Sequence, residues 1–395
     1  MKIALLIYSP AISGGTFVIY EYVKGLTKLG HEVSLITDFN VTKEWLSWYP
    51  EAKDFNFMSF AEAKDKEFDL VYATWWATVS RLSEIKSKKY AYFVQSFEPY
   101  FVSESQKPLM KYIESTYVRN LPVITEATWI KKLLEKNYNL PVLLVKNGIR
   151  KDIFRNKGLA FKEREKDTVR ILIEGPVDVP FKNVPKTVKL CREAGVGEIW
   201  LLTSSDIDNY PGVDRVFSKL SIFDTPLVYR SCDILVKLSY VEGMFGPPLE
   251  MFHCGGTAIV YNVTGHDEYI RHKKNAFVVK RDNDTMVVKY LRKLKNDPTL
   301  LKQMKQEAIK TANEWYGWED AVVEFEKATQ HIFLNIPTPS RRDLLSKEKF
   351  FKSSYNIHQE SLDLINKSKL LKIENNIRRV RRNVFDKIRS LSQDN

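Results

Sequence analysis

Residues 2–37 read KIALLIYSPAISGGTFVIYEYVKGLTKLGHEVSLIT. An apolar run, KIALLIYS, is followed by a glycine-containing turn, an amphipathic stretch from Thr16 to Leu29, and a second apolar run, HEVSLIT. This order predicts a buried strand, a helix and another buried strand, which together form a right-handed βαβ unit of a parallel sheet. The first apolar run is too short for a secretory signal or for a helix that spans a membrane.

The alternation of short apolar runs with helical patterns continues through two blocks of the chain. The first block contains DLVYAT, KYAYFVQ, LPVITEA and PVLLVKNGI, and after a charged, weakly patterned linker at 157–166 the second contains VRILIEGP, EIWLLTS, DILVKLS, GTAIVYN and NAFVVK. The chain has 395 residues, enough for two domains of ordinary size. We therefore expect an α/β fold with two Rossmann-like domains, residues 1–160 and 161–335, followed by a helical extension at 336–395.

The basic charge of the chain is concentrated in that extension. The whole chain has a net charge of +12, and residues 366–395 contain nine Lys and Arg against three Asp and Glu. Within 369–391, apolar residues recur at spacings of three and four, which predicts a basic amphipathic helix. Such a helix packs on the body, packs on a second copy of the chain in a homodimer, or lies on a membrane surface, and the pattern leaves these alternatives open.

The remaining composition argues against several other classes of protein. Three cysteines, an odd number and widely spaced, indicate neither a disulfide framework nor a CxxC metal site, and they favour the reducing cytoplasm. The histidines show no HExxH spacing, and Asp282 and Asp284 are typical of a solvated turn, so we expect no metal. Because the basic surplus belongs largely to one terminal segment, we also expect no nucleic-acid partner.

The segment Glu242-Gly-Met-Phe-Gly-Pro-Pro-Leu-Glu250, followed by MFHCGGTAIVY, carries the most chemical information. Its two carboxylates flank a Gly-Pro turn, and Pro247 can occupy the first turn of a helix that carries Glu250. Free N–H groups at Phe245 and Gly246 would suit an anionic diphosphate or the hydroxyls of a sugar. A carboxylate in the turn can accept hydrogen bonds from sugar hydroxyls, and one in the helix can hold a ribose diol. Two acids at this spacing alone, however, are more typical of solvated helix charges.

With the small-residue turn and the strand that follow it, the segment resembles the EX7E motif of retaining glycosyltransferases of family 4. The resemblance covers residues 1–333 and is strongest at 175–275. It implies the GT-B fold, in which two Rossmann-like domains face each other across a cleft. It further implies that Gly14 and Gly15, in the glycine loop after the first strand, approach the phosphates of the donor, and that Lys182 binds the diphosphate.

The chain departs from the family's pattern at one position of the phosphate site. Pro176 stands where the family has an arginine, so one of two cations expected at the leaving group is missing. Either Lys182 acts alone, or Arg150 or another distant residue replaces the arginine. The same departure supports an alternative hypothesis, that the chain is a catalytically inactive, glycosyltransferase-like binding subunit of a glycan-assembly complex.

A second departure concerns the acceptor side, where the family's usual histidine is not evident. In its place stands the run YFVQSFEPYF, which contains Gln95 and Glu98 and follows the Trp75-Trp76 pair. This run resembles bacterial rhamnosyltransferases of the same family that build surface glycans, and it implies an acceptor-side role for Gln95 and Glu98. The alternative is that the aromatic residues belong to the core and that Glu98 caps a helix.

Taken as a resemblance, these features imply a metal-independent enzyme without a cofactor. It would transfer a sugar, with rhamnose as the first candidate, from a dTDP- or UDP-sugar to a glycan acceptor that is lipid-linked at the inner face of the membrane. Glu242 would orient the donor sugar and stabilise its developing positive charge, while cations and N–H dipoles stabilise the departing phosphate. A nucleotide-sugar epimerase or phosphorylase would need further acids or a cofactor lysine, which the segment around Glu242 does not favour.

Overall fold

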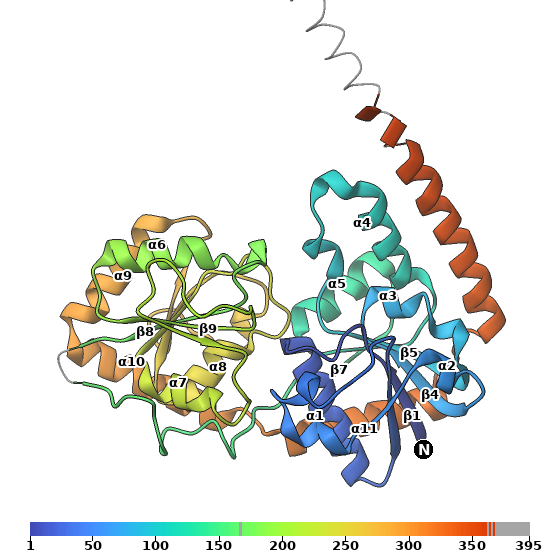
Figure 1. The fold of residues 1–395 in the computed structure, drawn as a ribbon, viewed down its shortest axis with the longest axis horizontal. Coiled ribbons are helices and arrows are strands. Elements are labelled where there is room, and N and C mark those ends of the chain that lie inside the picture. The colour runs from blue at the N-terminus through green and yellow to red at the C-terminus, as the bar shows by residue number, and fades with distance from the viewer. Residues whose placement is uncertain (166–167, 362, 365, 368–395) are drawn as a thin grey trace, which may run out of the picture.

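Two α/β domains lie side by side in the computed structural model (Figure 1). The structure describes residues 1–165, 168–361, 363–364 and 366–367, and within these ranges the strands form one sheet of seven strands and one of six. Every pairing between neighbouring strands of these described sheets is parallel. This confirms the α/β fold with two Rossmann-like sheets that the alternating pattern predicts.

The first domain is built on a sheet with the strand order β3-β2-β1-β4-β5-β6-β7. Its central strands are apolar over most of their length because helices cover both faces of a parallel sheet, and Ile3 to Leu6 of β1 are fully buried. The strands are β1 (Lys2–Leu6), β2 (Glu32–Ile36), β3 (Asn56–Met58), β4 (Glu67–Ala73), β5 (Lys86–Val94), β6 (Val123–Thr125) and β7 (Val142–Leu144). The helices of this part are α1 (Gly14–Lys28), α2 (Phe60–Ala63), α3 (Trp76–Val79), α4 (Lys107–Glu114) and α5 (Thr128–Tyr138).

The second domain repeats this plan with the strand order β10-β9-β8-β11-β12-β13. The order reverses between β8 and β11, since β9 lies on one side of β8 and β11 on the other. Its strands are β8 (Ile171–Glu174), β9 (Ile199–Thr203), β10 (Arg215–Ser218), β11 (Ile234–Lys237), β12 (Thr257–Tyr261) and β13 (Ala276–Val279). Its helices are α6 (Val184–Ala194), α7 (Thr225–Ser231), α8 (Gly246–His253), α9 (Asp284–Asn296) and α10 (Pro298–Glu314).

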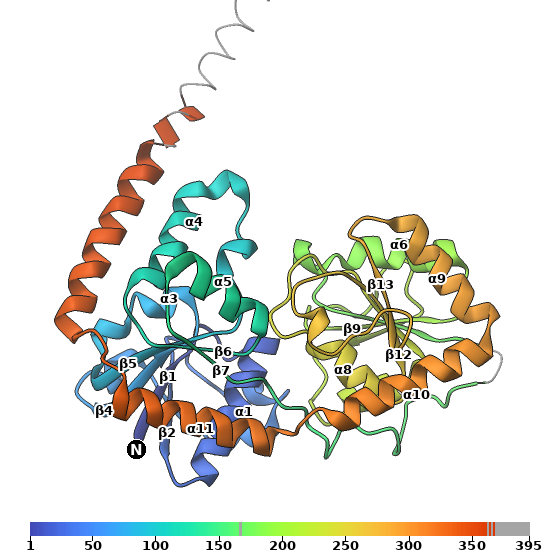
Figure 2. The same cartoon turned by 180° about the vertical axis from the view of Figure 1, so that it is seen from behind.

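The last labelled helix, α11 (Trp318–Asn335), packs against the first domain, as the view from behind shows (Figure 2). The sequence places this stretch in the second domain at 161–335, so the structure differs from the predicted boundary. The ring of Phe325 stacks on that of Tyr22 in α1 with 4.1 Å between centroids. A Cβ atom added at Gly25 would lie 2.2 Å from Val322, so only glycine allows this close approach of α1 and α11. The apolar face of α11 therefore completes the core of the first domain.

The chain crosses between the domains twice, and the two crossings touch. The Ile149 N–H donates to the Tyr316 carbonyl over 3.3 Å, and a Cβ atom on Gly148 would lie 2.4 Å from the backbone of Gly317. The outgoing and returning segments are thus packed backbone against backbone. This double crossing is where a hinge between the domains would lie.

Beyond α11, residues 341–361 form a helix that runs along the first domain and extends away from it (Figure 1). The helix is anchored near its start, where Leu344 is 3% exposed and Glu348 accepts hydrogen bonds from Arg119 (3.0 Å) and Tyr112 (2.5 Å). The amphipathic pattern at 369–391 lies outside the described residues. Within the part of the chain that the structure describes, no helix combines the length and apolarity needed to span a bilayer.

Candidate functional site

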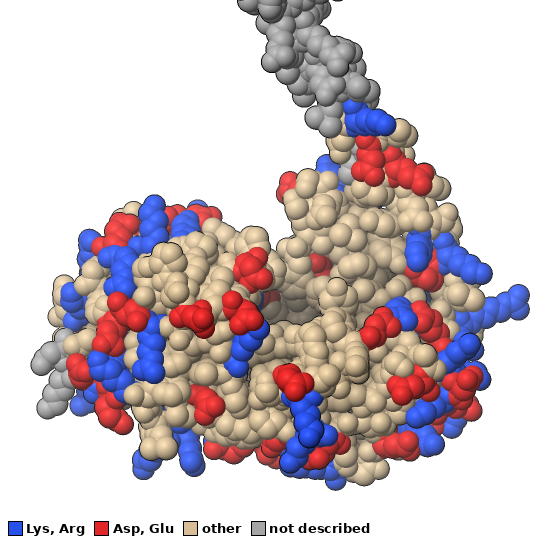
Figure 3. Space-filling view, viewed as in Figure 1, with Lys and Arg blue, Asp and Glu red and all other residues tan. Residues whose placement is uncertain are grey.

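The carboxyl ends of the two sheets meet at the interface between the domains, where the space-filling view shows a hollow (Figure 3). Gly243, in the loop after β11, lies so close to Gln95, the residue after β5, that an added Cβ atom would be 2.1 Å from the Gln95 carbonyl oxygen. In open α/β sheets, ligands bind beyond the carboxyl ends of the strands, at the point where the strand order reverses. In the second domain this point lies between β8 and β11.

Glu242 and Lys182, both predicted from the sequence, come together at this point. The Lys182 Nζ lies 3.0 Å from both carboxylate oxygens of Glu242, and the Nζ of Lys237 lies 3.5 Å from one of them. Glu242 is only 7% exposed. Burial alone would raise the pKa of Glu242, but the charges of Lys182 and Lys237 outweigh burial and lower it. The site therefore contains a buried carboxylate that stays ionised.

Lys182 reaches Glu242 because the loop after β8 folds back over the end of β11. Gly175, directly after β8, has φ +140°, a backbone conformation that L side chains rarely adopt. Asn183 ends the short 3₁₀ helix Pro180–Lys182 in the left-handed conformation, and its side-chain amide donates to the Leu238 carbonyl over 3.0 Å. These two residues set the path of the loop and hence the position of the lysine.

Lys237 and Glu174 belong to this cluster, and the sequence analysis did not identify them. Both are the last residues of their strands, β11 and β8, which pair with each other. The Lys237 ammonium donates to the Glu174 carboxylate and, over 3.2 Å, to the Glu174 carbonyl. The available signal was the lysine that ends the apolar run DILVK, but a lysine after such a run usually lies in solvent.

Glu250 lies one turn into α8, behind the loop that carries Glu242. Burial raises the pKa of Glu250 to about 7, an effect that the neighbouring Tyr229 hydroxyl partly offsets. At neutral pH this carboxyl is therefore protonated in a substantial fraction of molecules. The contact of Glu250 with a ribose stays a prediction.

The start of α8 differs in one detail from the sequence prediction of free amides. The Gly246 N–H donates to the Met244 carbonyl over 2.9 Å, so the local turn already satisfies it. Pro247 and Pro248 follow and have no N–H to offer. Phe245 is fully buried, and its carbonyl accepts from the Tyr269 hydroxyl. The bend is therefore tightly held, with fewer free donors than a helix start usually presents.

Three hydrogen bonds fix the backbone of the Glu242 loop, and two of them come from the first domain. The Thr264 hydroxyl donates to the Glu242 carbonyl (2.8 Å), and the Trp129 indole donates to the Gly243 carbonyl (3.0 Å). The Met244 N–H donates to the Glu126 carboxylate (2.9 Å). The loop is thus attached to both sides of the cleft.

Glu126 is a second acid that the sequence analysis did not single out. It follows β6 in the first domain, accepts from Met244 and from the Asn147 side chain (2.7 Å), and is buried. Burial raises its pKa to about 7, against the lowering effect of these hydrogen bonds. A single acid in the run LPVITEA does not indicate a functional site, because the Met244 amide that it binds comes from the other domain.

Gly14, Gly15 and Gln95 lie on the first-domain side of the cleft. Gly14 and Gly15 begin α1, with Ser13 accepting from the Thr16 N–H over 3.0 Å. A Cβ atom on Gly15 would lie 3.4 Å from the Gln95 side chain, whose buried carbonyl oxygen has no hydrogen-bond partner among the described residues. The structure thus brings Gly15, Gln95 and the Glu242 loop into one continuous patch. Their roles toward donor and acceptor stay predictions.

Glu98, the other residue predicted for the acceptor side, points into the core of the first domain. It is 2% exposed, and one carboxylate oxygen accepts from the Tyr92 hydroxyl (2.6 Å) and from the N–H of Trp76, the first residue of α3 (2.9 Å). Burial raises its pKa to about 8. This arrangement matches the capping alternative, and it does not bring Glu98 to the Glu242 cluster.

The pKa of Glu98 leads to a prediction about stability. A carboxyl whose pKa rises from 4.5 to about 8 on folding stabilises the fold fully below pH 4.5, and this contribution is lost as the pH rises toward 8. Glu98→Gln keeps an oxygen that accepts both hydrogen bonds and cannot ionise. We expect the free energy of unfolding of the wild type, measured with urea, to fall between pH 5 and pH 8. In the variant this fall should be smaller by at least about 1 kcal/mol. The exposed acid Glu104, changed to glutamine, is the control, and parallel pH profiles for Glu98→Gln and wild type would contradict the prediction.

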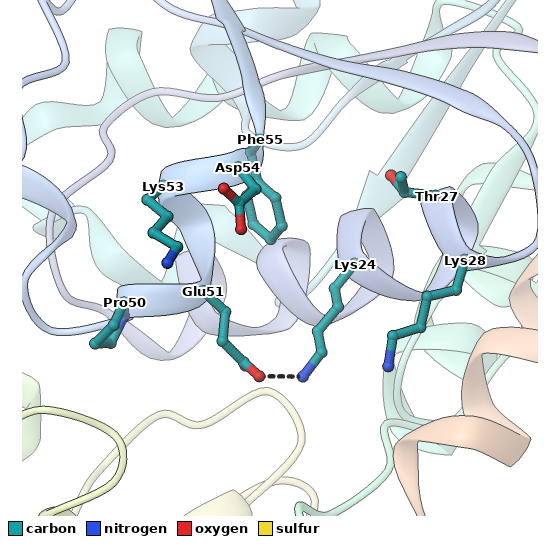
Figure 4. A pocket seen from close by; sticks show the side chains of 8 residues that line it. All are labelled: Lys24, Thr27, Lys28, Pro50, Glu51, Lys53, Asp54 and Phe55. Atoms are coloured by element: carbon teal, nitrogen blue, oxygen red, sulfur yellow. Dashed lines mark hydrogen bonds and ion pairs between the residues drawn. The ribbon is translucent and has the colours of Figure 1, made fainter.

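Arg150, which the sequence offered as a replacement for the missing arginine, is engaged elsewhere. Its guanidinium pairs with Glu21 (3.0 Å), Glu51 (2.9 Å) and Asp152 (2.7 Å), next to the double crossing between the domains. Glu51 also pairs with Lys24 across a surface hollow at the end of α1 (Figure 4). The carboxyl end of α1 lies where β2 begins, at the amino ends of the strands of the first sheet. The Glu242 loop instead faces the carboxyl ends of these strands, next to Gln95. Arg150 and this hollow are therefore separate from the Glu242 cluster.

Comparison with protein families supports a glycosyltransferase-like second domain. Residues 207–311 match the family model described as Glycosyl transferases group 1. This stretch contains Glu242 and Glu250 but begins after Lys182. No curated protein sequence matches the chain.

Solved structures with the same architecture span most of the chain. Sucrose-phosphate synthase from Thermosynechococcus elongatus has a TM-score of 0.67 at 15% identity, over 84% of this chain and 99% of its own. Anabaena HepE in complex with UDP and glucose has a TM-score of 0.66 at 12% identity, over 84% and 99%. WaaG, a glycosyltransferase involved in lipopolysaccharide biosynthesis, has a TM-score of 0.57 at 14% identity, over 84% and 100%. The chain therefore has the GT-B fold that the sequence resemblance implies.

Proposed function

We propose that this protein is a retaining glycosyltransferase that transfers a sugar from a nucleoside diphosphate to a glycan acceptor. The main support is the Glu242 carboxylate, buried and ionised beside two lysines at the switch point of the second sheet. This carboxylate lies within the stretch that matches group 1 glycosyl transferases. In such a position it can accept hydrogen bonds from sugar hydroxyls and stabilise the positive charge that develops on the sugar ring.

The donor would lie across the loop from Glu242 to Glu250. Lys182, whose side chain is 22% exposed, is the cation that can turn from Glu242 to the diphosphate. Glu250 would accept hydrogen bonds from the ribose hydroxyls. Gly14 and Gly15, at the start of α1, would approach the phosphates from the other side of the cleft.

In the proposed step the bond between the anomeric carbon and the phosphate oxygen breaks, and the acceptor hydroxyl oxygen bonds to that carbon on the same face. The acceptor proton passes to the departing phosphate oxygen, so the products are a glycoside with retained configuration and a nucleoside diphosphate. Lys182 would stabilise the charge on the leaving group, and Glu242 the charge on the sugar. Closing the cleft would keep water from the activated sugar.

We further propose a UDP- or dTDP-sugar as donor and a lipid-linked surface glycan as acceptor. The fold neighbour HepE is a complex with UDP and glucose, which supports a pyrimidine nucleotide. Rhamnose is the first candidate for the sugar, because the run YFVQSFEPYF resembles rhamnosyltransferases. Gln95 would contact the acceptor, and its position next to Gly15 and Gly243 supports this role.

The test is a panel of UDP-, dTDP-, GDP- and ADP-sugars incubated with the purified chain, with nucleotide release and the anomeric configuration of the product as readouts. We expect release from one UDP- or dTDP-sugar with retention at the anomeric carbon. Inversion would contradict the retaining mechanism. Nucleotide binding without any turnover, with or without glycan acceptors, would replace the proposal with the inactive binding subunit.

The basic segment at 369–391 leads to a prediction about membrane contact. We propose that it lies on the anionic inner face of the membrane, which would bring the enzyme to its lipid-linked acceptor. Deletion of residues 368–395 keeps the helix at 341–361 and its contacts with Arg119. We expect the full chain to float with vesicles containing anionic lipid and the deleted chain to remain behind, while neither floats with neutral vesicles. Equal flotation of the two chains would refute a membrane role of this segment.

A further inference from the structure

Lys237 is a buried cation at the centre of the Glu242 cluster. Its side chain is 1% exposed, and β11, whose end it forms, is paired with β8 and β12 on its two sides. Burial would lower the pKa of Lys237, but the charges of Glu174 and Glu242 outweigh it and raise the pKa. Lysine is rarely this buried unless it is paired. The position therefore holds a permanent positive charge on a rigid strand.

Lys182 differs from Lys237 in exposure and in support. It lies on a loop, is 22% exposed, and contacts Glu242 more closely, at 3.0 Å against 3.5 Å. It can thus move toward a diphosphate, whereas Lys237 cannot leave the sheet. In a donor complex Lys182 would move away from Glu242. The bound donor would at the same time bury the Glu242 carboxylate further.

The other ionisable groups around Glu242 would not help to keep it charged. Glu174 lies on β8, Glu250 on α8, and the Tyr229 and Tyr269 hydroxyls lie beside Glu250. Each of these groups is neutral or negative, so each favours protonation of Glu242 or leaves it unaffected. Across the cleft, Glu126 binds the Met244 amide and adds another acid. Among the described residues, Lys182 and Lys237 are the cations that contact the carboxylate.

We propose that Lys237 is a positioning residue: it is the fixed cation that keeps Glu242 ionised and in place after Lys182 has turned to the diphosphate of the donor. The inference rests on the proposed function, because it assigns Lys182 to the diphosphate. A buried carboxylate without a cation takes up a proton, and a neutral Glu242 could not stabilise positive charge on the sugar. The arrangement thus divides two tasks between two lysines, one mobile and one fixed.

The test compares wild type with Lys237→Met, which keeps an unbranched side chain one atom shorter and removes its charge. The pH dependence of kcat and of kcat/KM is measured with the donor that the wild type turns over. We expect the acid limb of kcat to move up by about one pH unit or more. The limb of kcat/KM should move less, since Lys182 still faces Glu242 in the free enzyme. Lys237→Arg should return both limbs toward those of the wild type.

A matched control separates this role from a general effect on the fold. Lys305, in α10, is a largely buried lysine that pairs with Asp233. Asp233 directly precedes β11, so this pair lies at the amino end of the strand, away from the cleft. Lys305→Met should lower stability and leave both pH limbs unchanged. If Lys237→Met does not fold, the double variant Lys237→Met/Glu174→Gln removes the cation together with one of its acids, and it should show the same shift of the kcat limb.

The possible results bear on different claims. Unmoved pH limbs in Lys237→Met or the double variant, with an active wild type, would overturn this inference and leave the proposed function standing. Equal shifts in Lys305→Met would also overturn it, because the effect would then be general. A wild type that turns over no nucleotide sugar would instead refute the proposed function.

Discussion

Glu242→Gln is expected to reduce sugar transfer by on the order of 10³-fold while the protein stays folded. The amide has nearly the shape of the carboxylate but carries no charge, so it cannot stabilise positive charge on the sugar. It also removes the partner that holds Lys182 at 3.0 Å. The measurement is kcat with the donor identified in the panel, together with circular dichroism and the thermal midpoint. Turnover within tenfold of the wild type would remove Glu242 from the mechanism.

Glu198 provides the matched control for this change. Like Glu242, it pairs with two cations, Arg170 at 2.6 Å and Lys162 at 2.5 Å, and these hydrogen bonds lower its pKa to about 2. It lies just before β9, at the amino end of the second sheet and away from the cleft. Glu198→Gln should therefore cost stability without changing turnover per folded molecule. A similar loss of turnover in both variants would point to a fold defect and not to chemistry.

Gly243→Ala is expected to lower kcat/KM by on the order of 10²-fold. The added Cβ atom would lie 2.1 Å from the Gln95 carbonyl oxygen and 2.8 Å from the Glu126 carboxylate, both in the first domain. The loop or the whole domain must move to relieve this contact. Since Glu242 is the preceding residue, its carboxylate would move with the loop. The measurement is kcat/KM for the donor, with unfolding by urea as the check on stability.

The control for Gly243→Ala is a glycine with an equally severe clash that lies away from the cleft. A Cβ atom on Gly197 would be 1.8 Å from the Val169 carbonyl oxygen, within the second domain. Gly197→Ala should lower the free energy of unfolding, with turnover per folded molecule unchanged. If Gly243→Ala retained full kcat/KM, the contact between the Glu242 loop and the first domain would have no part in activity.

The fold could be predicted from the sequence because its strands carry a local signal. Runs such as KIALLIYS and GTAIVYN are largely apolar, as is typical of strands covered on both faces, and the helices between them are long enough to cross the sheet. Glu242 was identified from a short motif and the strand that follows it, and Lys182 from its match to a position in the pattern of the family that the chain resembles. Their mutual contact in the structure agrees with a shared site but leaves their roles toward a ligand to experiment.

Other parts of the site depend on contacts that no local pattern records. Lys237 is buried because Glu174, 63 residues earlier in the chain, ends the neighbouring strand and binds it. Glu126 is buried because the Met244 amide comes from the other domain. The position of α11 likewise depends on its apolar face packing against α1. The apolar periodicity of α11 would be the same if the helix packed on the second domain. Sequence patterns give the face of a helix that is buried, and the structure gives the partner.

The return of α11 to the first domain also orders the events of synthesis. On the ribosome, β1 and α1 emerge before α11, so the contacts of Tyr22 and Gly25 with Phe325 and Val322 cannot form until α11 has been made. The second domain, from β8 to α10, is continuous in the chain and can fold before that. The nascent chain therefore completes the core of the first domain only after the whole second domain has been synthesised.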